Sequence, residues 1–340
     1  MAIFQSLTIR QIAEKAEVSI ATVSRALNGT GTVKESTMQR IQNAINELGC
    51  EIPKDLSSQK VKTKRLLASF PDLINPFNSN VIQGILDAAA RRGYQVIFYS
   101  NCNYALPSSY QFFLDQEEFY DGLLIAHNLP NQQLLSDLKE KFPVVMCSEH
   151  ISNASIPYVA IDDYAAACTA VNYLISTGHK KIACINSTLS NNYAFHRERA
   201  FRDCLKKAGL PIREDWVMHL PDVDFNVAVG SIAALFDSNE LPDAFFCVSD
   251  VFAASVIRLA NERNIHVPKD ISVVGFDDID LATMTTPKIT TIRQPAYQLG
   301  WQASNLLIEQ IENPTESVRR IILNTDLIVR DSTRYQEEHK

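Results

Sequence analysis

The chain has 340 residues and a formal net charge of −7, and 46% of its residues are hydrophobic while 21% are charged. This length predicts two or three compact domains, and the composition is that of an ordinary globular protein. The longest apolar runs fall short of the roughly 18 residues that a membrane span requires. Polar residues such as Gln5 and Thr8 interrupt the N-terminal apolar stretch and argue against a signal peptide, so we expect a cytoplasmic protein without membrane association.

Charge is unevenly distributed along the chain. Residues 1–65 hold ten lysines and arginines against six acidic residues, a balance of +4, so the remaining chain carries −11. Such an asymmetry suggests a basic, DNA-facing head on an acidic body, although modest local imbalances are common in other proteins too. The seven cysteines are scattered without the spacing of a zinc site or a disulfide framework, so we expect reduced thiols, no metal and no cofactor.

The first fifty residues contain the pattern of two tightly joined helices. Thr8 is a plausible N-cap for a helix over Ile9–Ala16, in which apolar residues recur at helical spacing. Ser19 can cap a second helix over Ile20–Leu27, which stops near a glycine. Because only Glu17-Val18 lies between the two helices, with the valine filling the angle, they have the form of a helix-turn-helix.

A third helix and a linker complete this region, so we expect a DNA-binding head over residues 1–51 and a hinge over residues 52–65. The third helix, over residues 34–48, presents a buried stripe made of Met38, Ile41, Ile45 and Leu48. The hinge is polar, contains Pro53 and is rich in lysine. Both a solvated tether and a segment that becomes helical on DNA fit this composition, and the sequence leaves the choice open.

From residue 66 to residue 340 short apolar runs alternate with amphipathic stretches, which predicts an α/β body. Strands are expected over Leu66–Phe70, Gln95–Ser100, Gly122–Ala126, Val144–Cys147, Tyr158–Ile161, Lys181–Ile185, Ala244–Val248 and Ser272–Phe276. Helices are expected over Val81–Arg92, Gln132–Lys141, Ala165–Thr177, Arg197–Ala208, Val227–Phe236, Val251–Arg263 and Tyr297–Ile311. This βαβ rhythm predicts parallel, doubly wound sheets. About 270 residues exceed one such sheet, so we expect two lobes with a ligand cleft between them.

The chain shows no pattern of a known catalytic site. It contains no GxGxxG, Walker A, GxSxG or HExxH string. Six histidines are isolated in sequence and favour structural roles; they are His127, His150, His179, His196, His219 and His266. Carboxylates follow two predicted strands, at Asp162-Asp163 and Asp277-Asp278, where acid–base chemistry or hydrogen bonds from a ligand's hydroxyls are both open to them. We therefore expect a binding protein and not an enzyme.

The second helix of the head would enter the DNA major groove and present its exposed side chains to the base edges. Arg25 could donate two hydrogen bonds to a guanine, although a simple phosphate contact is the alternative. Ile20 and Ala21 can make only apolar contacts, such as with a thymine methyl group. The short polar residues of this region suit phosphate oxygens and would position the head; they are Ser19, Thr22, Ser24 and Asn28, and Thr8 is expected at the DNA as well.

Strings of residues in the head and in the body carry a family signature. In the head these strings are Thr8-Ile9-Arg10-Gln11-Ile12-Ala13 and Ala16-Glu17-Val18-Ser19-Ile20-Ala21-Thr22-Val23-Ser24-Arg25-Ala26-Leu27-Asn28. In the body they include Asn75-Pro76-Phe77, Gly178-His179-Lys180-Lys181-Ile182, Pro268-Lys269-Asp270-Ile271-Ser272-Val273-Val274-Gly275-Phe276-Asp277-Asp278 and Thr290-Thr291-Ile292-Arg293-Gln294-Pro295. The chain thereby resembles the lactose/galactose repressor family over about residues 8–335. Three phrases are similar to its cytidine-repressor subgroup: Val171-Asn172-Tyr173-Leu174, Phe276-Asp277-Asp278-Ile279-Asp280-Leu281-Ala282 and Ile328-Val329-Arg330-Asp331-Ser332-Thr333-Arg334.

The chain departs from this family in its hinge and in the turn of its head. The resemblance implies a hinge leucine that wedges into the DNA minor groove, but Ser57-Ser58-Gln59-Lys60 replaces the family's Ala-Arg-x-Leu run. Leu56 or Val61 would have to act as the wedge, and a basic hinge that tracks phosphates through Lys60 without kinking the DNA is the alternative. Glu17 stands where the family usually has glycine, so a Cβ must be tolerated there at a small cost in strain.

The resemblance also implies an effector site between the lobes. Arg197 stands where the family's arginine grips effector oxygens, with Asp277 as the opposing acceptor, although an ion pair that holds the lobes together is the alternative. Phe77 could stack on a ligand ring or belong to the lobe-interface core. Glu149 could reach the ligand or be a solvated surface residue. The other residues implied for the site are Asn75, Ser148, Phe225 and Ser249.

Taken as a whole, the resemblance implies a homodimeric repressor that binds double-stranded operator DNA and is switched by a nucleoside or sugar effector. A periplasmic-type binding protein would share the two-lobe body, but it would need a signal peptide and no helix-turn-helix. An α/β enzyme acting on nucleosides would need a metal or phosphate site that the sequence lacks.

Overall fold

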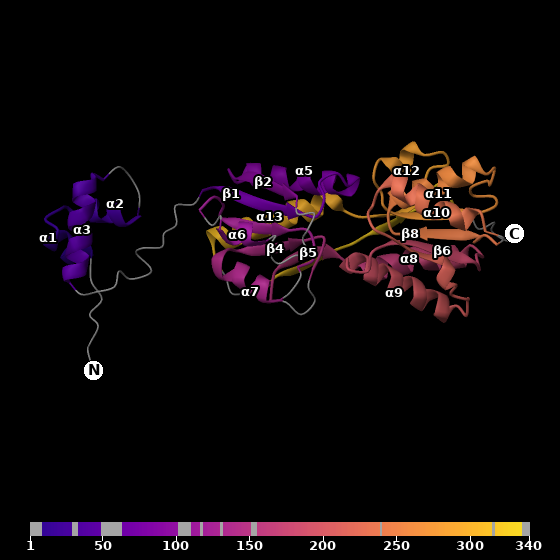
Figure 1. Ribbon diagram of the computed structural model, residues 1–340, viewed down its shortest axis with the longest axis horizontal. Helices are drawn as coiled ribbons and strands as arrows, with labels where there is room; N and C mark the ends of the chain where they lie inside the picture. Colours follow the sequence, from indigo (N-terminus) through magenta and orange to yellow (C-terminus); the bar gives the residue numbers. More distant parts are fainter. Residues whose placement is uncertain are drawn as a thin grey trace. The chain divides into compact units, whose positions relative to one another are not determined.

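The computed structural model describes residues 9–28, 33–48, 63–100, 110–115, 118–129, 132–150, 155–238, 240–314 and 317–334 (Figure 1). The chain divides into two compact units, residues 1–63 and residues 64–340. Within the described ranges no helix is both long enough and apolar enough to cross a membrane.

The first unit is a bundle of three short helices, α1 (Ile9–Lys15), α2 (Ile20–Asn28) and α3 (Glu35–Glu47). Their buried side chains form one small core, made of Ile12, Ala13, Ala16, Val23, Ile41, Ala44 and Ile45. The prediction of a buried Met38 is wrong, because this side chain is 40% exposed and the buried stripe of α3 begins at Ile41. The first turn of α3 thus extends beyond the core that the two shorter helices cover.

The second unit contains two six-stranded sheets, with strands in the orders β11-β5-β4-β3-β1-β2 and β12-β10-β9-β8-β6-β7. The first sheet consists of β1 (Arg65–Phe70), β2 (Gln95–Ser100), β3 (Gly122–Ile125), β4 (Val144–Cys147), β5 (Tyr158–Ile161) and β11 (Arg320–Leu323). The second consists of β6 (Ile182–Ser187), β7 (Val217–Leu220), β8 (Ala244–Cys247), β9 (Ser272–Asp277), β10 (Thr290–Arg293) and β12 (Asp326–Ile328). Neighbouring strands are parallel, except that β12 runs antiparallel to β10. The predicted α/β fold with parallel, doubly wound sheets is confirmed.

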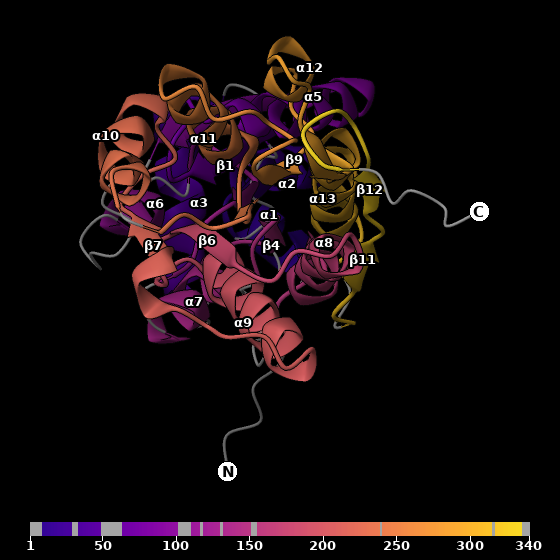
Figure 2. The ribbon, with the colours of Figure 1, turned by 90° about the vertical axis from the view of Figure 1, so that its right-hand side faces the viewer.

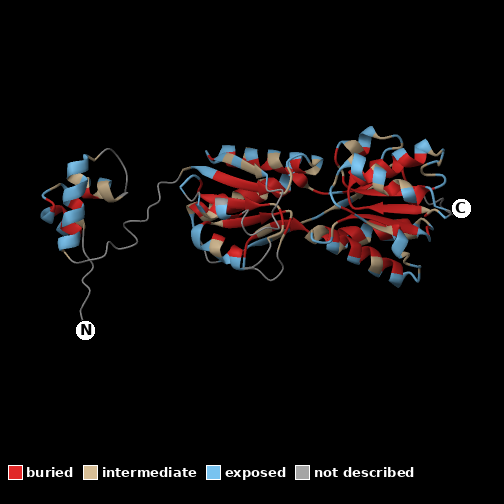
Figure 3. Cartoon of the chain, in the orientation of Figure 1, coloured by how far each residue is buried: buried red, intermediate tan, exposed pale blue. Residues whose placement is uncertain are grey.

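Helices pack on both sheets, and the buried residues concentrate in the strands between them (Figure 3). The first lobe contains α5 (Pro76–Arg91), α6 (Gln111–Asp115), α7 (Gln132–Lys141) and α13 (Ala296–Glu312). The second contains α8 (Asp163–Ser176), α9 (Asn192–Lys207), α10 (Phe225–Phe236), α11 (Asp250–Glu262) and α12 (Leu281–Met284). Helices α8 and α9 pack together on one face of the second sheet, and α10 and α11 on the other (Figures 1 and 2).

The chain passes between the lobes three times, after β5, after β10 and between β11 and β12. The second passage brings α13 against α5, where two glycines let the helix backbones touch. A Cβ on Gly84 would lie 2.1 Å from Tyr297 O, and a Cβ on Gly300 would lie 2.0 Å from Val81 O. The first lobe is therefore completed by a helix that follows most of the second lobe in sequence.

All the predicted strands are present, but four strands and two short helices were missed: β7, β10, β11, β12, α6 and α12. Three of the missed strands, β7, β11 and β12, lie at sheet edges, and edge strands lack the continuous apolar run that marks a buried parallel strand. The prediction that Arg197 begins a helix is wrong. Helix α9 begins at Asn192, because the polar residues before Arg197 form its first turn and not a loop.

Candidate functional sites

The head presents α2 as a capped and partly exposed helix. The backbone N–H of Thr22 donates to Ser19 Oγ at 3.1 Å, and the two hydroxyls lie 2.7 Å apart, which confirms Ser19 as the N-cap. The turn before this cap contains Glu17 with φ of 51°, a left-handed conformation that favours glycine. The strain expected at Glu17 is thus present in the backbone.

Ile20, Ala21 and Arg25 lie on the exposed side of α2, and Ile20 is 53% exposed. The Nε atom of Arg25 donates to Ala21 O at 3.2 Å, so a guanine would have to be met by the terminal nitrogens of the guanidinium. Ser24 is half-buried. The remaining DNA contacts predicted from sequence fall outside the described residues: Thr8, Leu56, Lys60 and the side chain of Asn28.

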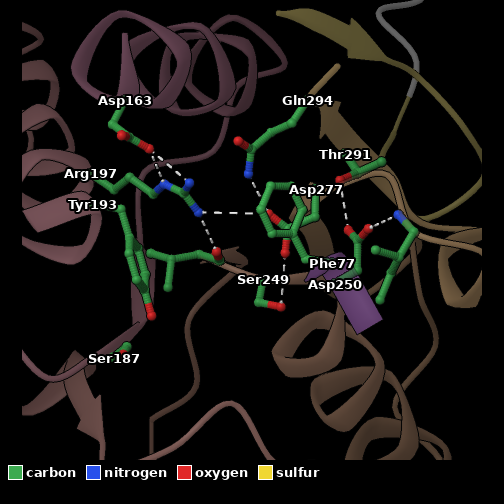
Figure 4. Close-up of polar contacts among 12 residues, drawn as sticks. Phe77, Asp163, Ser187, Tyr193, Arg197, Ser249, Asp250, Asp277, Thr291 and Gln294 are labelled. Atoms are coloured by element: carbon green, nitrogen blue, oxygen red, sulfur yellow. Dashed lines mark hydrogen bonds and ion pairs between the residues drawn. The ribbon is translucent and has the colours of Figure 1, made fainter. Parts of the chain in front are cut away.

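In the body, Arg197 is the centre of a buried polar cluster (Figure 4). It lies on α9, where its Nε donates to Asp163 Oδ1 on α8 at 2.8 Å and its Nη2 forms an ion pair with the same oxygen at 2.7 Å. Its Nη1 donates to Val248 O at 2.8 Å. The guanidinium also covers the ring of Phe276, with its Cζ 3.6 Å from the ring centroid. The tight pairing of α8 with α9 is what brings the aspartate and the arginine together.

Asp277 ends β9 and faces this arginine at a longer distance. Its Oδ1 lies 3.9 Å from Arg197 Nη1 and accepts a hydrogen bond from Gln294 Nε2 at 2.7 Å. Its Oδ2 accepts from Ser249 Oγ at 3.2 Å. Burial raises the pKa of Asp277 to about 6, although Arg197 and the two hydrogen bonds oppose the rise. All of these groups belong to the second lobe, so the pair does not tie the lobes together.

Asp250 supports the turn that carries Asp277. It is fully buried at the start of α11, accepts from Thr291 Oγ1 at 2.6 Å, and accepts from the backbone N–H of Ile279 at 2.9 Å. Burial raises its pKa well above the usual value, and repulsion from Asp277 adds to the rise. This contact holds the backbone just after Asp277, where φ is 111° at Asp277 itself and 56° at Asp278.

Glu149 and Ser148 enter from the loop after β4 in the first lobe. Ser148 is half-buried with φ of 66°, and Glu149 is only 7% exposed. The alternative that Glu149 is a solvated surface residue is therefore wrong. Burial raises its pKa to about 8, repulsion from Asp163 adds to the rise, and Arg197 opposes it. Glu149 thus belongs to the same electrostatic cluster as Arg197.

The other implied effector residues have structural contacts of their own. Asn75 caps α5 by accepting from the backbone N–H of Phe77 at 3.1 Å. Phe77 is half-buried against the main hydrophobic core. Phe225 begins α10, also half-buried, with the guanidinium of Arg258 5.6 Å from its ring centroid. Ser249 caps α11 while it donates to Asp277.

A cavity of about 340 Å³ opens beside Asp163, lined by His150, Ile161, Asp162, Asp163, Tyr164, His196, Arg199 and Ile322. The rings of His150 and His196 are nearly parallel, with centroids 6.4 Å apart. Burial lowers the pKa of His150. Among the described residues no group of histidine, cysteine and acidic side chains is arranged to hold a metal ion.

Sequence reasoning did not assign Asp163, Gln294 or Asp250 to this cluster. A signal was present for Asp163, which follows a strand as one of two adjacent aspartates. Its pairing with Arg197 depends on the packing of α8 against α9, which no local pattern encodes.

Comparisons with known proteins cover both units. Residues 8–50 match the family of bacterial regulatory proteins of the lacI type, and residues 171–333 match the periplasmic binding protein-like domain. The HTH-type transcriptional repressor CytR of Escherichia coli (strain K12) is 33% identical over 96% of both chains.

Two solved structures with bound sugars are also similar. The complex of the transcriptional regulator CelR with cellobiose covers 96% of this chain and 99% of its own, with 26% identity and a TM-score of 0.72. A regulator of Enterococcus faecium with bound ribose covers 79% of this chain and 98% of its own, with 25% identity and a TM-score of 0.70.

Proposed function

This chain belongs to the LacI family of bacterial regulatory proteins, as a DNA-binding transcriptional repressor and not an enzyme, and we propose that a small hydroxylated effector switches its affinity for operator DNA. The effector binds in the cleft between the lobes and is a nucleoside or a sugar. A nucleoside is favoured by the phrases shared with the cytidine-repressor subgroup. A sugar is the second candidate, since two similar regulators hold cellobiose and ribose.

The observation that carries the proposal is the buried cluster around Arg197 and Asp277. A guanidinium donor and a carboxylate acceptor lie 3.9 Å apart at the carboxyl end of β9, where open α/β sheets bind ligands. Neighbouring hydroxyl and amide groups, on Ser249 and Gln294, extend this set. Such mixed donors and acceptors suit the paired donor and acceptor character of a ligand hydroxyl.

Switching follows from ligand contacts with both lobes. Arg197, Ser249, Asp277 and the ring of Phe225 would hold the effector from the second lobe. The first-lobe contacts would come from Asn75, Phe77, Ser148 and Glu149. A ligand that touches both lobes binds the closed arrangement better than the open one, and only that difference can shift the equilibrium between them.

The protein binds a two-fold symmetric operator as a homodimer. One head buries too little DNA surface for a specific site, so two heads read two half-sites. Arg25, Ile20 and Ala21 would meet the bases, while Ser19, Thr22, Ser24, Asn28 and Thr8 would meet phosphates. The hinge would contribute Leu56 as a minor-groove wedge or Lys60 as a phosphate contact. Reorienting the lobes then changes the spacing of the heads and the fit to the operator.

The proposal is tested with operators selected from random DNA by the full-length protein. Fluorescence anisotropy measures DNA affinity with and without cytidine, adenosine, ribose or cellobiose. Asp277→Ala should abolish the response and leave effector-free DNA affinity nearly unchanged. Asp280→Ala, which removes an exposed carboxylate on the same loop that makes no cap hydrogen bond, should respond like the wild type. A full response of Asp277→Ala at the wild-type effector concentration would remove Asp277 from the site.

A further inference from the structure

The buried ionisable groups of the effector cluster are mostly acidic. Among the residues that the structure describes, Arg197 is the one lysine or arginine that is buried. Four buried carboxyl groups surround it or lie within electrostatic range of its partners: Glu149, Asp163, Asp250 and Asp277. A ligand that enters this cluster therefore meets more acidic than basic groups.

The positive charge of Arg197 is already compensated inside the protein. Two of its nitrogens bind Asp163, a third binds Val248 O, and one face of the guanidinium rests on Phe276. An anionic ligand group would have to compete with Asp163 for the same nitrogens. Displacing that carboxylate would leave it buried without a partner, which is strongly unfavourable.

Asp277 and Glu149 differ in what they can offer a ligand. Among the described residues, Asp277 accepts hydrogen bonds from two neutral donors, Ser249 and Gln294, and the nearest cationic nitrogen that pairs with it, on Arg197, lies 3.9 Å away. Glu149 sits close enough to Asp163 for the two to repel each other. Burial raises the pKa of Asp277 to about 6 and that of Glu149 to about 8, so near neutral pH Asp277 is largely ionised while Glu149 is largely protonated and uncharged. An anionic ligand group placed beside Asp277 would therefore be repelled by this carboxylate.

Resting on the proposed function, we propose that the effector is an uncharged or cationic molecule with several hydrogen-bond donors, and that the site rejects the phosphorylated form of the same molecule. The cluster thus selects its ligand by charge as well as by shape. A nucleoside or a free sugar would act as the signal, while the phosphorylated product that a kinase reaction makes from it would not.

Other arginines lie near the cluster. Arg293 and Arg330 are both paired with Asp278, at 2.6 Å each, and are thereby compensated. Arg199 lines the cavity beside Asp163, but it is exposed, and its Nε is 3.8 Å from Asp203. An anion bound there would be screened by solvent and held weakly. Arg199 therefore does not offset the buried acidic groups.

The test compares matched pairs of ligands with the full-length wild-type protein. Cytidine and cytidine 5′-monophosphate, adenosine and adenosine 5′-monophosphate, and ribose and ribose 5-phosphate are titrated by calorimetry. The uncharged member should bind at least about a hundredfold more tightly, as expected for a buried, unpaired charge. A phosphorylated member that binds as tightly as its partner overturns the charge proposal and leaves an effector-switched repressor intact.

A second arm needs no effector. Thermal unfolding is followed in sodium phosphate and in sodium chloride of equal ionic strength. Wild type should show no difference, whereas Asp163→Asn, which frees Arg197, should be stabilised by millimolar phosphate. Asp162→Asn removes the adjacent exposed charge and keeps a residue able to cap α8, so it should behave like the wild type.

The two arms separate the two proposals. If no member of any ligand pair binds, the proposal of a hydroxylated effector is refuted. The thermal-unfolding experiment in phosphate and chloride still tests whether the cluster rejects anions. Stabilisation of wild type by phosphate, or equal behaviour of Asp163→Asn and Asp162→Asn, would overturn the charge proposal. Should Asp163→Asn fail to fold, the wild-type phosphate measurement remains decisive.

Discussion

Replacing Glu149 by glutamine should change how the stability of the body depends on pH. Burial raises the pKa of Glu149 from 4.5 to about 8, so between these values the native state holds a proton that the unfolded state has released. The stabilisation linked to this proton is fully present below the unfolded pKa and is lost as pH rises through the folded one. One such proton is worth about 1.4 kcal/mol per pH unit, or about 2.5 kcal/mol between about pH 5.5 and pH 7.5.

The assay is urea unfolding of the full-length protein at these two pH values. Wild type should lose about 2.5 kcal/mol more unfolding free energy on going to the higher pH than Glu149→Gln does. The contributions of all other groups cancel in this difference. Glu140→Gln, which removes an exposed charge on α7, should keep the wild-type pH dependence. Equal losses in wild type and Glu149→Gln would refute the burial of an uncompensated carboxyl at this position.

Three further predictions concern the head and the core of the first lobe. Arg25→Ala should reduce the discrimination between operator and random DNA by about 1–3 kcal/mol per half-site, and equal losses on both DNAs would mean that Arg25 contacts phosphate only. Glu17→Gly should relieve the left-handed backbone at φ of 51° and stabilise the head by about 0.5–1 kcal/mol, measured by slower amide hydrogen exchange in residues 9–48. Gly300→Ala should destabilise the body by at least about 1–3 kcal/mol in urea unfolding, because its Cβ would meet backbone atoms of α5, whereas Gly230→Ala on the open side of α10 should be neutral or stabilising.

The fold could be predicted where one segment carries its own pattern. The buried strand β4 was placed correctly because Val144–Cys147 is a continuous apolar run, as expected for a strand covered on both faces. The edge strand β11, Arg320–Leu323, was missed because half of its residues are exposed and it pairs with a strand far away in sequence. Local patterns therefore identify most of the strands inside each sheet, with β10 as the exception, and one of the four edge strands, β2.

Part of the buried cluster could be predicted from the sequence, but its electrostatics could not. Arg197, Ser249 and Asp277 were named together, and the structure joins them in one cluster. That Asp163 compensates the arginine, and that Glu149 is buried, depends on how α8, α9 and the loop after β4 pack together. These features depend on tertiary packing, and they determine which charge a bound ligand can carry.

The order in which the elements leave the ribosome differs from the order in which they pack. The second lobe's main strands, β6 to β10, form one continuous stretch of chain, whereas the first lobe needs α13 and β11 from near the C-terminus. During synthesis α5 therefore keeps its glycine-containing face uncovered until Gly300 has emerged, even though it was made more than two hundred residues earlier. Domains generally fold as units during synthesis. Here both lobes are completed by the C-terminal segment, the first by α13 and β11 and the second by β12. Since the second lobe already has its other five strands in one stretch, the first lobe is the one that waits with a large apolar face uncovered.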